Sequence, residues 1–194
     1  MATDDEEILA EMRAALVKAR GYADHFGWAT DRDLEEWSVA RLLIEALDKD
    51  GLPSLTNLKR RGRPNDPPDC EALDFNGQRV AIEVTELVDA DAIRKFKASR
   101  IHDPAEWTKD KFLHALTKLI TSKEARFPNL KGQPYGGGYH VVIFTAESNI
   151  SMTSVEEWLS GHCFHKNTPD MRVFIILSYK PEVKKYPYWE LNFN

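Results

Sequence analysis

Residues 69–87 read DCEALDFNGQRVAIEVTEL, and this stretch carries the strongest structural signal in the chain. Asn76-Gly77 at its centre is the dipeptide most typical of a tight β-hairpin turn. The arm that follows, 78–87, is rich in β-branched residues, and apolar and polar positions alternate along it. The stretch therefore predicts two antiparallel strands, over 69–75 and 78–87, joined by a short turn.

Two turn geometries fit this hairpin, and they give different registers. A two-residue loop at Asn76-Gly77 pairs Cys70 with Glu83 and places Asp69 on the other face. A three-residue loop, with Gly77 in the left-handed conformation, sets Asp69 directly opposite Glu83. Both loops are common, and the sequence leaves the choice between them open.

Further strands and helices are predicted outward from the hairpin. Residues 139–146 and 172–179 are near-continuous apolar runs, which suit strands buried on both faces. A helix over 153–159 connects them, so we expect the two strands to be parallel. A last edge strand is predicted within 183–193, where Pro187 is tolerated only at an edge.

The remaining segments complete an α/β pattern. The order of elements predicts an α/β fold, a sandwich with a central mixed β-sheet flanked by helices. We expect one domain over 1–194, with a core at 33–194 and an N-terminal helical addition at 1–32. Helices are predicted over about 4–20, 33–51, 91–100 and 108–127, and a long Pro/Gly-rich loop over 51–68.

Composition excludes several classes of protein. The chain has 194 residues, 42% of them hydrophobic, and a formal net charge of −5, which is typical of an ordinary globular domain and not of collagen, disorder or a disulfide scaffold. We expect no transmembrane helix, because no apolar run approaches about 18 residues. The acidic N-terminus does not resemble a signal peptide, so Cys70 and Cys163 are interpreted as reduced thiols of a cytoplasmic protein.

Two acidic residues of the hairpin point to metal chemistry. Glu83 and Thr85 are two residues apart on a strand and so share a face. Asp69 opens the strand with which they would pair. Close carboxylates repel each other unless they share a cation or one of them has a raised pKa. Their oxygens are the ligands that Mg²⁺ prefers.

The same segment resembles the PD-(D/E)xK phosphodiesterase motif of the restriction-endonuclease-like fold. The resemblance rests on Pro68-Asp69, a spacer of thirteen residues, and Glu83-Val84-Thr85, together with the element order over roughly 33–179. It implies a nuclease that hydrolyses DNA with Mg²⁺ or Mn²⁺. It also implies that Asp69 and Glu83 hold the metal, with the backbone carbonyl of Val84 as a further ligand.

The chain departs from that family at Thr85, where the family has a catalytic lysine. Threonine can form a hydrogen bond to the attacking water but supplies no charge. In some families of this fold the lysine lies on a neighbouring helix. Lys123 continues the apolar stripe of the 108–127 helix, so it is a candidate for that role. The alternative is that Lys123 ends the stripe and extends to water.

A helix acid often completes the metal site in the resembling family. Glu45, on the helix before the motif, is the candidate here. Arg41 and Lys49 lie four residues away on either side of it. The alternative interpretation of Glu45 is therefore an exposed, salt-bridged helix face.

Four cations, Lys59, Arg60, Arg61 and Arg63, fall within five positions just before Asp69. They are candidates to bind the phosphate backbone of DNA beside the metal. The alternative is an ordinary solvated loop.

Two functional hypotheses follow. The first is a metal-dependent nuclease, in which Asp69, Glu83, Thr85 and Lys123 act on the scissile phosphate. The second is a catalytically silent relative that binds nucleic acid or a protein partner, favoured by Thr85 and by the negative net charge. The position of Lys123 discriminates between them, because an ammonium close to both carboxylates favours the enzyme.

Overall fold

Six strands form one mixed sheet within the part of the chain that the computed structural model describes, residues 22–23, 32–62, 64–99, 101 and 103–194. Their order in the sheet follows their order in the chain. The β3–β4 and β4–β5 pairs are parallel, and the outer pairs are antiparallel. The strands are β1 (Thr56–Arg60), β2 (Cys70–Leu73), β3 (Arg79–Glu86), β4 (Tyr139–Thr145), β5 (Met171–Leu177) and β6 (Tyr188–Glu190).

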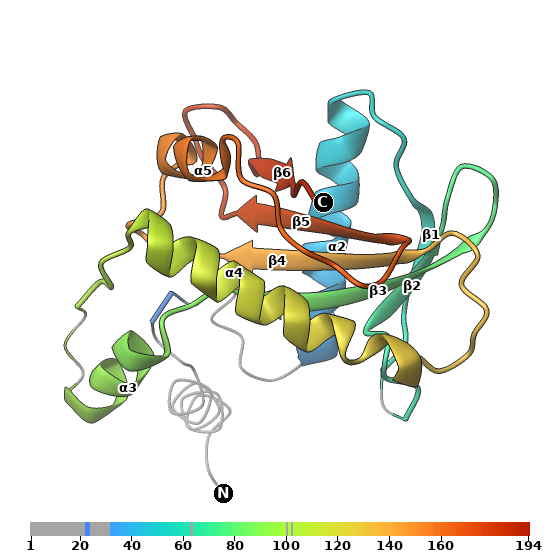
Figure 1. The fold of residues 1–194 in the computed structure, drawn as a ribbon, viewed down its shortest axis with the longest axis horizontal. Helices are drawn as coiled ribbons and strands as arrows, with labels where there is room; N and C mark the ends of the chain where they lie inside the picture. Colours follow the sequence, from blue (N-terminus) through green and yellow to red (C-terminus); the bar gives the residue numbers. More distant parts are fainter. Residues whose placement is uncertain (1–21, 24–31, 63, 100, 102) are drawn as a thin grey trace, which may run out of the picture.

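Helices cover both faces of the sheet, which confirms the α/β class. Figure 1 shows α2 (Arg32–Lys49) behind the sheet and α4 (Lys109–Glu124) in front of it. The other helices are α3 (Ala90–Ser99), the short 3-10 helix η1 (Phe127–Asn129) and α5 (Met152–Leu159). None of the helices described is long and apolar enough to span a membrane.

The sheet separates two apolar cores. Leu116 of α4 packs in the core that contains Val141 and Ile175, whereas Leu43 of α2 packs in the core on the other face. Every residue of β4 is buried, and in β5 only Arg172 is exposed. The near-continuous apolar runs thus correspond to central parallel strands, as the sequence predicted.

The hairpin adopts the three-residue loop. Cys70 pairs with Ile82, and the backbone N–H of Asp74 donates to the carbonyl of Gln78 over 2.9 Å. Gly77 has φ of +75°, a conformation that favours glycine because it lacks a Cβ. Continued by one residue, this register sets Asp69 opposite Glu83 on the face covered by α4.

The prediction of a loop throughout 51–68 is wrong, because Thr56–Arg60 forms the edge strand β1. This strand pairs with β2 on one side only, and four of its five residues are exposed. A short polar edge strand therefore lacks the apolar alternation by which strands are found in a sequence. The helix predicted over about 4–20 lies outside the described residues.

His140 on β4 gives the fold a predicted pH response. Burial, helped by the charge of Arg172, lowers the pKa of His140 from 6.5 to about 4. Between these values the unfolded chain binds a proton that the folded protein excludes, so stability falls as the pH falls. His140→Leu should flatten the pH dependence of the free energy of unfolding by up to about 1.4 kcal/mol per pH unit.

Urea unfolding at several pH values between 6.5 and 4 measures this effect. The same substitution at His114, which is exposed on α4, is the matched control and should change the slope little. Parallel curves for the wild type and His140→Leu would show that His140 does not titrate in this way.

Candidate functional site

Three carboxylates meet where the β2–β3 pair begins. One oxygen each from Asp66, Asp69 and Glu83 lies within 4.8 Å of the others, a spacing that could hold a metal ion. Asp69 is 7% exposed and Glu83 is fully buried, whereas Asp66 is half-buried. Buried carboxylates at this separation require cations or protons, since their mutual repulsion is poorly screened.

The strand register brings two of these residues together. Asp69 directly precedes β2, and its Oδ2 accepts a 2.7 Å hydrogen bond from the backbone N–H of Val84. Glu83 precedes Val84 on β3 and points to the opposite face of the strand, toward α4. Asp66 comes from the Pro-rich loop before β2, and the sequence analysis did not identify it.

Lys123 reaches this cluster from the last turn of α4. It lies eleven residues after Phe112 and continues the buried stripe that contains Leu116 and Ile120. Its Nζ is 2.6 Å from Glu83 Oε2 and 3.7 Å from Asp69 Oδ2. The structure therefore places an ammonium beside both carboxylates, and the Lys123 side chain is only 8% exposed.

Two further contacts hold Lys123 in this position. Its Nζ donates to the carbonyl oxygen of Val84 over 2.8 Å. Its own carbonyl accepts a 3.0 Å hydrogen bond from the hydroxyl of Tyr139, at the start of β4. The end of α4 is thus tied to both β3 and β4, which fixes where the ammonium lies.

Arg126 adds a second cation that sequence reasoning missed. Its Nη1 lies 3.0 Å from Glu83 Oε2, and its Nη2 lies 2.7 Å from Asp66 Oδ1. It lies three residues after Lys123, a spacing that indicates one face of a helix, but α4 ends before it. The signal was present in the sequence, because Arg126 lies within the helix predicted over 108–127 and follows Lys123 at helical spacing.

Burial and the neighbouring charges shift the pKa values of the two most buried carboxylates of the cluster. Burial raises the pKa of Glu83, and the charge of Asp69 raises it further, while Lys123 and Arg126 act in the opposite direction. Burial likewise raises the pKa of Asp69 against the influence of Lys123. Glu83 Oε1 is buried and has no hydrogen-bond partner among the described residues.

An unpartnered, buried carboxylate oxygen is costly unless another group satisfies it. Glu83 Oε1 therefore tests whether the residues present fit a metal ion. The available donors are carboxylate oxygens, which suit the hard cations Mg²⁺ and Mn²⁺. By this criterion the cluster fits a divalent cation.

A helix acid does lie near the cluster, but it is Glu36 rather than Glu45. The side chain of Glu36 is 13% exposed and accepts a 2.6 Å hydrogen bond from Arg32. Burial, followed by the charge of Asp69, raises the pKa of Glu36 to about 7. Glu36 also continues the buried stripe formed by Ala40, Leu43 and Leu47, and that pattern could have identified it.

Glu45 does not join the cluster. It lies nine residues after Glu36, which at about 100° per residue places it on the opposite face of α2. Its carboxylate pairs with Arg41 at 3.3 Å, and both side chains are about half exposed. This is the exposed, salt-bridged arrangement that the spacing of charges also allowed.

Thr85 and Val84 take different positions around Glu83. Thr85 is half-buried on the same face of β3 as Glu83, two residues further along the strand. The side chain of Val84 packs in the core against α2, and its carbonyl is the group that Lys123 contacts. The carbonyl proposed from the family resemblance as a metal ligand therefore already has a cationic partner.

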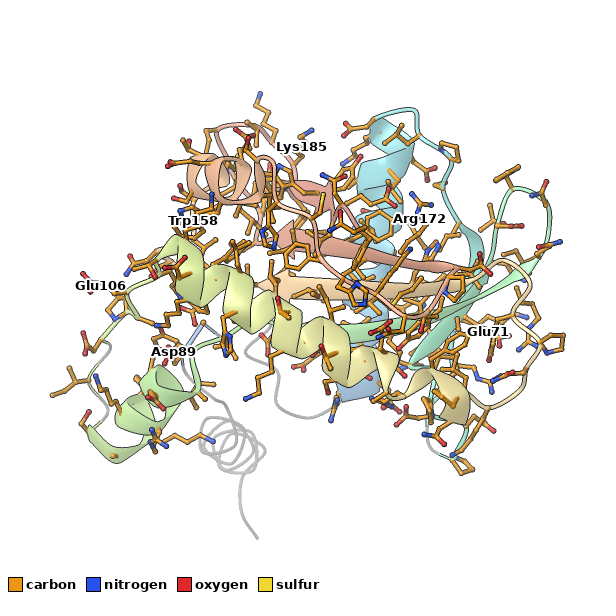
Figure 2. The ribbon with its side chains drawn as sticks, in the orientation of Figure 1. Glu71, Asp89, Glu106, Trp158, Arg172 and Lys185 are labelled. Atoms are coloured by element: carbon orange, nitrogen blue, oxygen red, sulfur yellow. The ribbon has the colours of Figure 1, made fainter. Side chains whose placement is uncertain are left out.

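The predicted basic cluster separates into two groups. Lys59 and Arg60 are exposed on the edge strand β1, whereas Arg63 lies outside the described residues. Arg61 donates to Glu71, as Arg79 does, at distances of 3.0 and 2.6 Å. Figure 2 shows Glu71 at the β1–β2 side of the sheet.

Arg61 and Arg79 also tie the hairpin to a neighbouring loop. Arg61 donates to the carbonyl of Lys131 over 3.1 Å, and Arg79 donates to that of Gly132 over 2.6 Å. Arg61 is thus engaged within the molecule. The part of the cluster that faces solvent is Lys59 and Arg60.

Comparisons of the chain with protein families, with curated proteins and with solved structures found no match. The fold and the carboxylate cluster are therefore the basis for any statement about function.

Proposed function

We propose that the protein is a metal-dependent phosphodiesterase that hydrolyses DNA, with Mg²⁺ or Mn²⁺ as its cofactor. The observation that carries the proposal is the unpartnered, buried Oε1 of Glu83 within a group of three carboxylates. Burying such an oxygen without a partner costs free energy, and a hard divalent cation is a partner that carboxylate oxygens bind well. The resemblance of Pro68-Asp69 and Glu83-Val84-Thr85 to the PD-(D/E)xK motif supplies the reaction.

The residues of the cluster take separate roles in this proposal. Asp66, Asp69 and Glu83 would hold the metal, which polarises the scissile phosphate and lowers the pKa of a bound water. Lys123 supplies the positive charge that Thr85 lacks, because its ammonium lies beside both Asp69 and Glu83.

DNA is proposed as the substrate on the strength of two features. The family resemblance implies DNA, and Lys59 and Arg60 are exposed on the strand next to β2, which Asp69 immediately precedes. Basic side chains contact phosphates without reading sequence, so they would position the backbone and leave specificity to other groups.

A second candidate function has an observation of its own. The Nζ of Lys123 contacts Glu83 and the Val84 carbonyl and lies 3.7 Å from Asp69, which are the three ligands that the resemblance implies for a metal. An ammonium held by all three can replace the cation structurally. The contacts that favour the enzyme are therefore also compatible with a silent domain that binds nucleic acid or a protein partner.

The experiment that separates the two candidates measures metal binding and cleavage together. Calorimetric titration of Mn²⁺ is compared with nicking of supercoiled plasmid in Mg²⁺ or Mn²⁺, for the wild type and for Asp69→Asn. The nuclease predicts metal-dependent nicking by the wild type, with loss of both signals in the variant. No metal binding and no nicking by the wild type would contradict the nuclease and leave the binding module.

A further inference from the structure

The two cations of the cluster are held very differently. Lys123 is buried and bonded to a backbone carbonyl as well as to Glu83. The Arg126 side chain is 33% exposed, against 8% for Lys123, and of its two partners Asp66 is 39% exposed whereas Glu83 is fully buried. Ion pairs open to water are weak and exchange easily, whereas removing a buried charge from its partner is costly. Arg126 is therefore the cation that the cluster can release.

The contacts of Arg126 also show what it occupies. Its two terminal nitrogens bridge Glu83 and Asp66, at 3.0 and 2.7 Å, and these are two of the three carboxylates that could hold a metal. A guanidinium in this position neutralises two of the carboxylates that would hold a divalent cation, although it leaves Glu83 Oε1 unpartnered. The guanidinium and a divalent cation therefore compete for Asp66 and Glu83.

We propose that Arg126 is a displaceable latch, an inference that rests on the proposed function. Its guanidinium, which spans Asp66 and Glu83, competes with a divalent cation for these carboxylates. When the cluster is loaded with a divalent cation, the guanidinium leaves the carboxylates and turns its N–H groups to the phosphodiester. The planar fork of arginine suits the paired oxygens of a phosphate. Its position at the half-exposed rim of the cluster leaves it room to move.

Mn²⁺ affinity tests the latch. Removing Arg126 should raise the affinity if its guanidinium competes with the cation, and lower it if Arg126 supports the site. Calorimetric titration with Mn²⁺ alone is carried out on the wild type, Arg126→Gln and Arg126→Lys. We expect Arg126→Gln to bind Mn²⁺ more tightly by about tenfold. Arg126→Lys should lie between the two, because a lysine keeps the charge but cannot span both carboxylates.

Arg172→Gln is the matched control. Arg172, shown on β5 in Figure 2, makes a two-point contact with Glu190 at 2.7 Å and is 44% exposed. Its substitution changes the net charge by the same amount, two strands away from Glu83 and on the opposite face of the sheet, and should leave Mn²⁺ affinity unchanged. A similar gain in affinity in Arg172→Gln would overturn the latch, because the gain would then reflect overall charge.

The remaining outcomes separate the latch from the nuclease. Unchanged or weaker Mn²⁺ binding in Arg126→Gln overturns the latch and leaves the nuclease standing. No Mn²⁺ binding in any chain overturns both. The role at the phosphate is tested by plasmid nicking at saturating Mn²⁺, where Arg126→Gln should be slower than the wild type by about tenfold or more despite its tighter metal binding. Equal nicking rates would overturn that role.

Discussion

Glu83→Gln is expected to lower metal-dependent cleavage of DNA by at least about a thousandfold, and to weaken Mn²⁺ binding with it. Glutamine has almost the same shape as glutamate, so the substitution removes charge from a fully buried position without leaving a cavity. It also replaces one carboxylate oxygen by an amide nitrogen, which donates hydrogen bonds and cannot bind a metal. The loss should therefore appear in chemistry as well as in affinity.

The initial rate of plasmid nicking at fixed Mg²⁺, together with calorimetric titration of Mn²⁺, measures this loss. Glu45→Gln is the matched control, because it makes the same chemical change at a half-exposed carboxylate paired with Arg41. The control should retain both signals. If Glu83→Gln nicks plasmid as fast as the wild type, Glu83 does not hold the catalytic metal.

Lys123→Met is expected to destabilise the fold by about 3–5 kcal/mol at neutral pH, the range found when one partner of a buried ion pair is removed. Methionine fills much of the lysine volume, so the effect reports charge more than packing. Without the ammonium, the buried carboxylates of Asp69 and Glu83 repel each other, and among the described residues Arg126 remains as the cation in contact with Glu83. Cleavage should fall with stability, because the same charge is proposed to act on the phosphate.

Urea unfolding of the wild type and four variants, Lys123→Met, Lys118→Met, Glu83→Gln and the double variant, measures the effect on stability. Lys118→Met is the control, because Lys118 is exposed on the same helix, and it should change the free energy of unfolding by less than about 0.5 kcal/mol. The double variant Glu83→Gln/Lys123→Met should lose less than the sum of the two single losses, since it removes both charges of one pair. Additive losses would indicate that the two side chains act independently.

The central part of the fold could be predicted from the sequence because its signals are local. Asn76-Gly77 located the hairpin, and the apolar runs near Val141 and Val173 located strands with both faces buried. The register of the hairpin could not be predicted, because both loop lengths satisfy the same dipeptide. It was decided by tertiary packing, which places Cys70 and Ile82 together in the core against α2.

The parts of the site that escaped prediction lack such local signals. Asp66 lies in a Pro/Gly-rich loop, where the path of the chain depends on contacts such as that of Lys131, whose backbone N–H donates to the Pro67 carbonyl over 2.7 Å. Glu36 could have been preferred to Glu45 from the stripe of α2 that contains Leu43. Glu45 was chosen because it lies on the helix before the motif, but it is nine residues after Glu36, and nine residues on a helix reverse the face.

The agreement between the chain order of the strands and their order in the sheet bears on how the protein assembles during synthesis. A domain folds as its chain emerges, and each strand here can add to the edge left by the strand before it. The residues of the cluster, from Asp66 to Arg126, all emerge before β4. Until β4 has been made, β3 is an open edge of the sheet, because β4 is the strand that pairs with it on the side where Glu83 lies beside Val141. Pairing of β4 along this edge, together with the hydrogen bond from the Tyr139 hydroxyl to the Lys123 carbonyl, therefore links completion of the sheet to the position of Lys123 in the site.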